Sequence, residues 1–372
     1  MEQNSQNEKS IDSSRFKRFF AERWERIKSM KGKDWLNFFL NNALIFVLLI
    51  FLIVVAVIAN VKNGVNLFSI SNIIFIIEGS AKAVFLALGV GGIIILTGTD
   101  LSAGRVVGFT AILSAALLQP AFSETSTVIF AGVEAFPLPV VVLIVMIIGG
   151  IIGFINGFFV ARFKLHPFIV TLSTSLVVFG FANIIAFMGN RAQVQDTIPA
   201  YGSFYDFSIP LFGNSMRFFV FIAIAAIILT WFLWNYTKFG KNMYAVGCNP
   251  EAATVSGISV SKTIILVFMY AGVLYGFAGF LEGAAGSGTS ADAIITGANF
   301  ELWAIAACVI GGVSFTGGTG KISGIVIGVL VFTCLDIGLS KIDFSGDERN
   351  IFKGAIILFA VTLDMRKYIV KR

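Results

Sequence analysis

The sequence predicts an all-α integral membrane protein with about ten transmembrane helices. Its composition is 57% hydrophobic and only 13% charged, with a mean hydropathy of +0.88, which is too apolar for a soluble protein of 372 residues. Apolar runs close to the roughly 20 residues that cross a bilayer recur along the chain. Glycine occurs 38 times, often at the four-residue spacing that lets membrane helices approach closely.

The first forty residues, 1–40, form a basic segment ahead of the apolar runs. They hold nine of the 27 Lys and Arg residues, and they are too long and too charged to be a signal peptide. We expect either a cytoplasmic helix lying on the lipid of the inner leaflet or a solvated positive tail. The apolar side chains of such a helix would be Phe16, Phe19, Phe20, Trp24 and Ile27.

Ten apolar runs follow, so residues 41–368 are predicted to form one transmembrane domain and 369–372 a cytoplasmic tail. The third and eighth runs are short and interrupted by glycine. The runs cover residues 41–59, 71–97, 104–118, 140–161, 167–188, 217–236, 261–282, 300–314, 321–340 and 351–367.

The basic residues predict that both termini lie in the cytoplasm, because most Lys and Arg then fall on the cytoplasmic side. Ten spans divide into five and five, and an odd number in each half makes the halves inverted in the membrane. The loops TGTDLSAGR and GAAGSGTSAD share small polar residues and one Asp, which agrees weakly with such a repeat. The basic residues that this predicted topology places on the side away from the cytoplasm are Lys62, Lys82, Arg191, Arg217, Lys341, Arg349 and Lys353.

The first of these loops places an acidic residue, Asp100, between two apolar runs. Irregular backbone at membrane depth persists only where protein buries it or water reaches it. One hypothesis is therefore a turn that lines or gates a polar path, with Asp100 fixing the turn, Thr99 and Ser102 nearby, and Arg105 balancing the charge. The alternative is that Asp100 caps the third span. Both can hold.

Other charged residues in the apolar runs are scattered singly, so a proton relay is not favoured. Glu78 and Lys82 are four residues apart on a helix, which predicts an ion pair between them. Trp303 lies near the predicted outer end of the eighth span, where it either stacks on a sugar or anchors the helix at the interface. The remaining acidic residues of this outer region are Glu282, Asp292, Glu301 and Asp336.

No signature of catalysis, metal or cofactor binding is found in the sequence. His166 stands alone, and the three cysteines form no spaced cluster. TGGTGKIS resembles a phosphate-binding loop, but Phe315 and Ile322 occupy positions that require Gly and Ser or Thr. We expect no cofactor, no metal, no enzyme activity and no nucleic-acid partner.

A polar hinge, 239–261, separates the sixth and seventh spans. Asn249 suits a helix cap, Pro250 the first helical position, Glu251 the positive amino end and Gly257 the position after the helix. Residues 250–256 are therefore predicted to form a short helix, which is marginal alone and needs a packing partner. The hypotheses are a docking element for a partner protein and a well-capped loop helix.

Three motifs, NPEAATVSGISV, GTDLSAGR and AIAACVIGGVSFTGGTG, resemble the membrane permeases of bacterial ABC-type monosaccharide importers. The resemblance covers about residues 41–368, and it is greatest to galactose/methyl-galactoside permeases, with ribose permeases more distant. The outer loops 119–139 and 189–216 show no clear match.

The resemblance implies a homodimer in the bacterial inner membrane, a cytoplasmic ATPase partner and an external sugar-binding protein. It also implies a coupling helix that fits a groove of the ATPase. That helix would comprise Asn249, Pro250, Glu251, Ala252, Ala253, Thr254, Val255, Ser256, Gly257 and Ile258.

The predicted function is therefore a permease subunit that imports a monosaccharide with ATP hydrolysed by a separate protein. Asp100, Ser102, Arg105 and Trp303 are the candidate residues of its path or gate. One alternative is a secondary sugar carrier driven by an ion gradient, which would transport without partners. A membrane-embedded enzyme is a second alternative, and the missing catalytic motif weighs against it.

Overall fold

The structure is a computed structural model that describes residues 43–122, 128–188, 193–194, 199–211, 213–285, 291–292 and 296–369. The predicted basic segment, 1–40, lies outside the described residues. Contacts divide the chain into two units, Met1–Ile50 and Phe51–Arg372, and the packing contacts and cavities described below all lie in the second unit.

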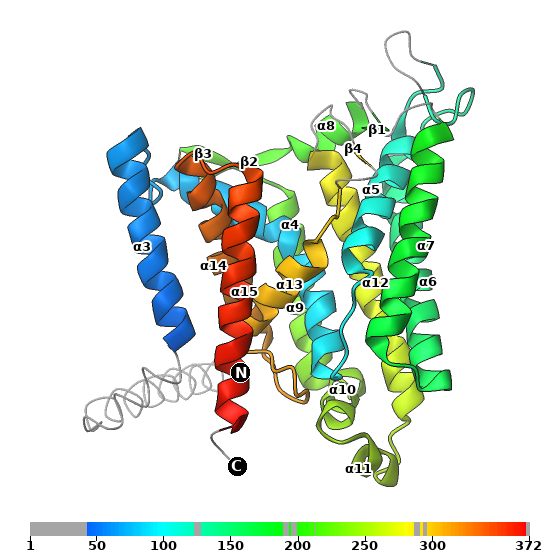
Figure 1. The fold of residues 1–372 in the computed structure, drawn as a ribbon. Helices are drawn as coiled ribbons and strands as arrows, with labels where there is room; N and C mark the ends of the chain where they lie inside the picture. The colour runs from blue at the N-terminus through cyan, green and yellow to red at the C-terminus, as the bar shows by residue number, and fades with distance from the viewer. Residues whose placement is uncertain are drawn as a thin grey trace, which may run out of the picture. The chain divides into compact units, whose positions relative to one another are not determined.

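Each of the ten predicted apolar runs overlaps a helix of the structure (Figure 1). Their bounds are α3 Ala43–Asn63, α4 Ile70–Ile95, α5 Ala103–Leu118, α6 Leu138–Phe163, α7 Pro167–Met188, α9 Phe219–Tyr236, α12 Val260–Ala285, α13 Phe300–Ile310, α14 Ile322–Lys341 and α15 Gly346–Ile369.

Six of these helices are long and apolar enough to cross a membrane, counted over the described residues: α4, α6, α7, α9, α12 and α14. Apolar but shorter helices are α5, α13 and the 50–63 part of α3. Three further helices are short and lie between these elements: α8 Pro199–Tyr205, α10 Lys238–Cys248 and α11 Pro250–Val255.

The described residues are mostly helical, as the predicted all-α class requires, and the short strands that form between the long helices were not predicted. Gln193–Val194 (β1) pairs with Ala291–Asp292 (β4), and Ser208–Leu211 (β2) forms an antiparallel hairpin with Asn214–Arg217 (β3). Arg217 therefore closes a hairpin and does not begin the sixth apolar run, whose helix α9 starts at Phe219.

Helices α6 and α12 pack closely along glycines of both helices. A Cβ atom at Gly149 would overlap the carbonyl oxygen of Gly272, and one at Gly276 would overlap that of Val145. The predicted role of the four-residue glycine spacing is confirmed here, since only small residues permit this approach of backbones.

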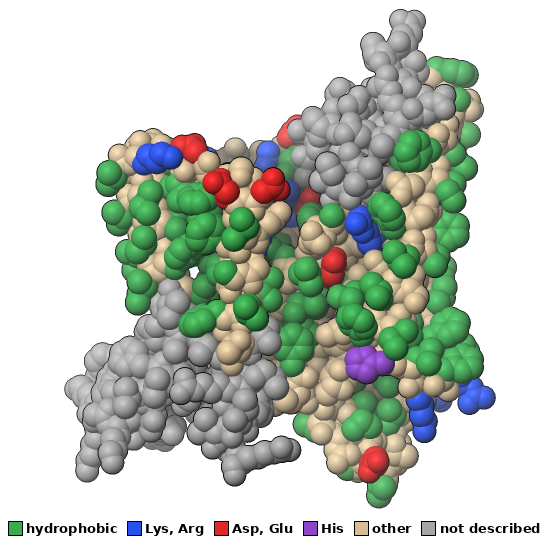
Figure 2. All heavy atoms as spheres, in the orientation of Figure 1, with side chains coloured by type: hydrophobic (Ala, Val, Ile, Leu, Met, Phe, Trp, Pro, Cys, Tyr) green, Lys and Arg blue, Asp and Glu red, His purple; other side chains and the backbone are tan. Residues whose placement is uncertain are grey.

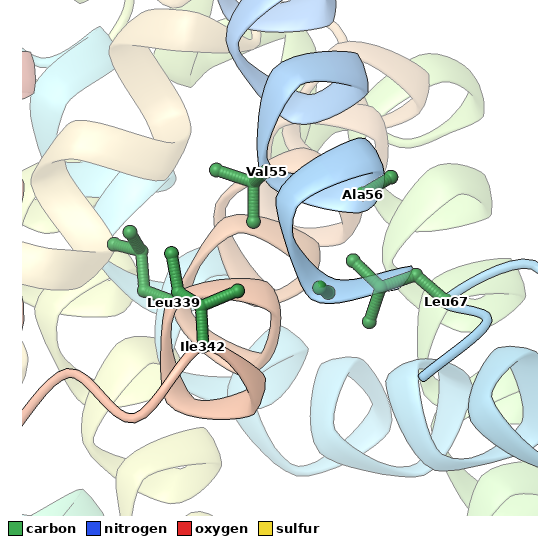
Figure 3. Close-up of a cluster of buried hydrophobic side chains, with 6 residues drawn as sticks. Val55, Ala56, Leu67, Leu339 and Ile342 are labelled. Atoms are coloured by element: carbon green, nitrogen blue, oxygen red, sulfur yellow. The ribbon is translucent and has the colours of Figure 1, made fainter. Parts of the chain in front are cut away.

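Helix α3 is joined to the end of α14 by a cluster of apolar side chains (Figure 3). Polar contacts support the same junction, where Lys62 Nζ lies 3.3 Å from Asp343 Oδ2 and Asn63 Nδ2 donates to that carboxylate at 2.9 Å. The buried members of the cluster are Val55, Ala56, Ala59, Leu67, Leu339 and Ile342.

Helix α15 begins at Gly346, five residues before the start that hydropathy predicted. The physical reason is a reciprocal cap at its amino end. Ser345 N donates to Glu348 Oε2 at 2.7 Å, and Glu348 N donates to Ser345 Oγ at 3.3 Å. These bonds satisfy amide groups at the helix start, so a polar first turn precedes the apolar part.

The two ends of the second unit differ in structure. Helix α8 and the β2–β3 hairpin lie at one end, and α10 and α11 lie at the other (Figure 1). On the face shown in Figure 2, hydrophobic side chains extend along the helices between these ends. A membrane-facing surface of this kind is expected for helices that lie in lipid.

Candidate functional site

A cavity of about 550 Å³ lies among α4, α12, α13, α14 and α15. Tyr205 of α8 and Arg217 of β3 also contribute to its wall, so the cavity approaches the hairpin end of the molecule. Its size falls in the range typical of small-molecule sites. Long helices position most of the lining, which makes the wall part of the packed bundle.

Three ion pairs join residues of the cavity lining, two of them between elements that are distant in sequence and one between the consecutive helices α14 and α15. Their atoms and distances are Arg217 Nη1 to Glu78 Oε2 at 2.9 Å, Lys82 Nζ to Glu282 Oε1 at 3.9 Å and Lys353 Nζ to Asp336 Oδ1 at 2.9 Å. The pairs compensate charges that would be costly to bury singly. They also bring together acidic residues that are isolated from one another in the sequence.

The expected ion pair between Glu78 and Lys82 was therefore wrong. Both residues lie on α4, but Glu78 binds Arg217, whose backbone N–H also donates to Glu78 Oε1 at 3.0 Å. Lys82 lies nearest Glu282 of α12 instead. Partners from other elements compete successfully here because the tertiary fold positions them around the cavity.

Aromatic and apolar side chains complete the wall. Trp303 lies half-buried on α13, and its ring meets that of Phe332 edge to face at a centroid distance of 5.5 Å. Phe75 and Phe300 also line the cavity. Trp303 therefore lines the cavity, while its contact with cargo stays a prediction.

A second, more polar cavity of about 620 Å³ shares Phe75, Glu78 and Arg217 with the first. Its remaining lining comes largely from β2, β3 and the turn between them. The Arg217 guanidinium also lies over the ring of Tyr205, 4.4 Å from its centroid. Arg217 and Glu78 therefore stand at the boundary between the two cavities.

Asp100 lies in the buried turn between α4 and α5. Its Oδ1 accepts hydrogen bonds from the backbone N–H of Ser102 at 2.9 Å and from Ser102 Oγ at 2.6 Å. Ser102 precedes the first residue of α5, so the carboxylate stabilises the turn that leads into this helix. The hydroxyl of Tyr275 lies nearby without making a hydrogen bond of good geometry.

A chain of hydrogen bonds joins this turn to α6 and α7. Asn156 Nδ2 donates to Ser102 Oγ at 2.9 Å, and Thr174 Oγ1 donates to Asn156 Oδ1 at 2.6 Å. Thr171 Oγ1 accepts from Leu101 N at 3.1 Å. The buried polar turn is thereby tied to two neighbouring helices.

Of the four predicted path residues, the described cavity wall includes Trp303 but not Asp100, Ser102 or Arg105. The Arg105 guanidinium lies 4.4 Å from the centroid of the Phe179 ring. The structure thus brings Asp100 and Ser102 together as one bonded unit and places Trp303 in a separate site. Roles of all four residues in transport stay predictions.

The predicted short helix of the hinge is confirmed as α11, which ends one residue earlier than expected. Asn249 Oδ1 accepts from Glu251 N at 2.9 Å and from Ala252 N at 3.0 Å, and Gly257 has the positive φ of +79° that suits a helix end. Ala253 is buried, whereas the Val255 side chain is 91% exposed. An apolar side chain projecting this far is available for a protein partner.

Helix α10 connects α11 to the interior. A Cβ atom at Gly247 would overlap the carbonyl oxygen of Ile95, the last residue of α4. The same carbonyl accepts a hydrogen bond from Gly318 N at 2.9 Å, and Tyr244 Oη donates to Gly320 O at 2.9 Å. The carboxyl end of α4 is thus held between α10 and the 314–320 loop.

Sequence reasoning missed most of the cavity wall. Arg217, Lys353 and Asn350 were not singled out, because hydropathy identifies spans and does not show which spans face one another. One signal was available. Glu78, Lys82 and Asp336 are ionisable residues in or beside apolar runs, and such residues usually face a polar interior.

An apolar helical bundle with a charged internal cavity and an exposed capped helix at its other end defines a membrane permease. Residues 72–361 match the family described as "Branched-chain amino acid transport system / permease component", and the chain belongs to this family. It is a multi-pass inner-membrane transport subunit of the ABC importer type and not an enzyme. An ion-driven secondary carrier is not favoured.

The chain is similar over most of its length to several named sugar permeases. The galactose/methyl galactoside import permease of Escherichia coli (strain K12) is 37% identical over 93% of this chain and 100% of its own length. The corresponding protein of Haemophilus influenzae is 39% identical over 89% and 96%, and the E. coli ribose import permease is 30% identical over 86% and 93%. No solved structure matches the chain significantly.

Proposed function

We propose that this chain imports a monosaccharide of the galactose or methyl-galactoside kind. The names and the full-length similarity of its relatives support this cargo. The observation that carries the proposal is the paired arrangement of a sugar-sized cavity at the hairpin end and an exposed coupling helix at the other. A permease driven by a separate ATPase needs both features.

All ten apolar helices span the membrane in this proposal, five in each inverted half, with both termini cytoplasmic. The shortest helix is the third of each half, since α5 has 16 residues and α13 has 11. Short spans at corresponding positions often adjoin a transporter binding site. A Cβ atom at Gly104 of α5 would overlap Glu301 of α13, so the two short helices also lie close together.

The transmembrane domain would cover residues 41–368. Residues 1–40 would form a basic interfacial segment attracted to the inner leaflet, and 369–372 a cytoplasmic tail. The basic residues of both flanks support this orientation.

Helix α11 acts in this proposal as the element that receives force from the ATPase. Its cap keeps the helix formed, and Val255 supplies an exposed apolar contact. Closure of the ATPase dimer on ATP would push α11, and α10 would pass the movement to Ile95 at the end of α4. The other half of α4 carries Phe75 and Glu78 of the cavity wall, with Lys82 near the middle of the helix.

The proposed partners follow from this arrangement. The cytoplasmic ATPase would bind α11, and an external sugar-binding protein would deliver cargo at the β2–β3 end. A second copy of the chain would complete a homodimer around the transport path, with membrane lipid around it. The buried turn at Asp100 would hold α5, α6 and α7 in register while the path opens and closes.

The decisive experiment reconstitutes the chain into proteoliposomes with its ATPase and the external binding protein. We expect uptake of radiolabelled galactose that requires ATP and both partners. Uptake by the chain alone under an ion gradient, or uptake of leucine in place of galactose by the full assembly, would contradict the proposal. A matched assembly with an ATPase unable to hydrolyse ATP provides the control.

A further inference from the structure

The wall of the 550 Å³ cavity is balanced in charge. Its described lining includes three carboxylates and three cations, and each carboxylate has a cationic partner of the lining within 4 Å; Asp336 also contacts Arg349, which lies behind the lining, at 3.3 Å. An anionic ligand would meet a carboxylate beside every cation, and a zwitterion would have to break existing pairs. A neutral ligand leaves all three pairs intact. The pairing of the lining charges therefore favours a neutral occupant.

In one of the three pairs the two charged groups are not in direct contact, unlike those of the other two pairs. Lys82 Nζ and Glu282 Oε1 are 3.9 Å apart, which is beyond hydrogen-bond distance. A hydroxyl oxygen between them could accept a hydrogen bond from the ammonium and donate one to the carboxylate. The other two pairs, at 2.9 Å, are already in direct contact.

The rest of the wall suits a flat, partly apolar ring. Trp303 and Phe75 supply aromatic surface, and Phe332 fixes the orientation of the Trp303 ring. The hydroxyl of Thr333 on α14 is buried without a hydrogen-bond partner among the described residues. A ligand with several hydroxyl groups could satisfy this oxygen as well as the gap between Lys82 and Glu282.

We propose that this cavity binds one neutral polyhydroxylated ring of monosaccharide size, with Lys82 and Glu282 receiving a ligand hydroxyl and Trp303 packing on the ring. The same wall discriminates against sugar acids and amino acids. The inference rests on the proposed function, because it names the site and the chemical class of the same cargo.

The test measures weak binding directly, without the external binding protein that would otherwise impose its own selectivity. The full chain with its ATPase in lipid nanodiscs is examined by saturation-transfer-difference NMR with three probes. We expect signals from methyl β-D-galactopyranoside and much weaker signals from D-galacturonate and L-leucine. Equal signals from leucine and the galactoside would overturn the inference.

Glu282→Gln is the sharpest variant, because it preserves shape and leaves Lys82 without its carboxylate. The cavity then gains one positive charge, and we expect binding of galacturonate relative to the galactoside to rise about tenfold. Trp303→Leu should lose most of the galactoside signal. Asp343→Asn is the matched control, since it removes the carboxylate of an ion pair with Lys62 outside the cavity.

Failure of this inference can be told apart from failure of the proposed function. ATP-driven galactose uptake by the wild-type assembly, together with unchanged ligand selectivity in Glu282→Gln and Trp303→Leu, would place the sugar site elsewhere. Absence of any sugar uptake by the wild-type assembly would overturn the proposed function itself. Both variants should retain the melting temperature of the wild-type complex within a few degrees.

Discussion

Gly247 of α10 lies directly against the carbonyl oxygen of Ile95, where α4 ends. A side chain at residue 247 would separate the two elements. This contact joins the hinge that carries α11 to the helix that carries part of the cavity wall. It is therefore the place where movement of the exposed helix would reach the interior.

Gly247→Ala should weaken this junction. The added methyl group overlaps backbone atoms, and overpacking of this kind costs about 1–3 kcal/mol. We expect a lower melting temperature and a larger loss of ATP-driven uptake than of basal ATP hydrolysis. Gly180→Ala on α7 is the control, because no atom of a neighbouring element lies within 4 Å of the place that its methyl group would occupy. Equal losses of melting temperature and of ATP-driven uptake in the two variants would exclude a special role for the junction.

Val255→Glu should reduce binding of the ATPase without destabilising the permease. The side chain is 91% exposed, and substitutions at such positions usually change stability by less than about 0.5 kcal/mol. Co-purification with the ATPase measures the effect, and Val255→Ile should retain binding. Full co-purification of the Glu variant would remove α11 as the docking element.

Ala253→Trp should behave differently from substitutions at Val255 or Glu251. Ala253 is only 4% exposed and faces the protein, so a bulky ring there must displace α11. We expect both a lower melting temperature and loss of ATPase binding. A variant that lost binding at unchanged stability would instead indicate that Ala253 contacts the partner directly.

Asp100→Ala should impair stability and transport more than Trp303→Phe. Removing the carboxylate leaves the Ser102 N–H and hydroxyl without their acceptor inside the protein, which costs about 1–3 kcal/mol. Asp100→Asn retains one acceptor oxygen and should recover part of the loss. Thermal unfolding in detergent and uptake in proteoliposomes check this order, and negligible effects of Asp100→Ala would make the turn dispensable.

Acidification should weaken the junction between α3 and α14. Hydrogen bonds from Asn63 and Lys62 lower the pKa of Asp343 below its ordinary value of 3.8. A lowered pKa stabilises the folded state above pH 3.8, and this contribution disappears as the pH falls through the folded value. The difference in melting temperature between wild type and Asp343→Asn should be constant from about pH 8 to 5 and shrink below about pH 4.

Hydropathy predicted where the apolar helices lie, the six long ones and the shorter α5 and α13 alike, because burial in lipid or protein demands uninterrupted apolar runs. The caps of α11 were equally predictable, since Asn249, Pro250 and Gly257 act through bonds to adjacent residues. Local chemistry of this kind is visible in one sequence. The start of α15 was missed because Ser345 and Glu348 cap a turn that is too polar for a hydropathy window.

The cavity could not be predicted in the same way. Glu78 and Lys82 have the correct spacing for an ion pair, yet the fold supplies better or competing partners in Arg217 and Glu282. These contacts join residues more than a hundred positions apart. Only the three-dimensional arrangement of helices determines them, and the short strands that position Arg217 give no strong periodic signal.

Helix α4 has 26 residues and is therefore about 39 Å long at 1.5 Å per residue. If it pivots as a rigid rod about its middle, a sideways shift of about 1 Å at Ile95 produces an opposite shift of about 0.6 Å at Phe75, which lies closer to the pivot. The part of the cavity wall at Phe75 and Glu78 would then shift with each stroke of the ATPase, whereas Lys82, at the middle of the helix, would stay almost in place. Binding of the cargo and transmission of force would thus both depend on rotation of the same rigid helix.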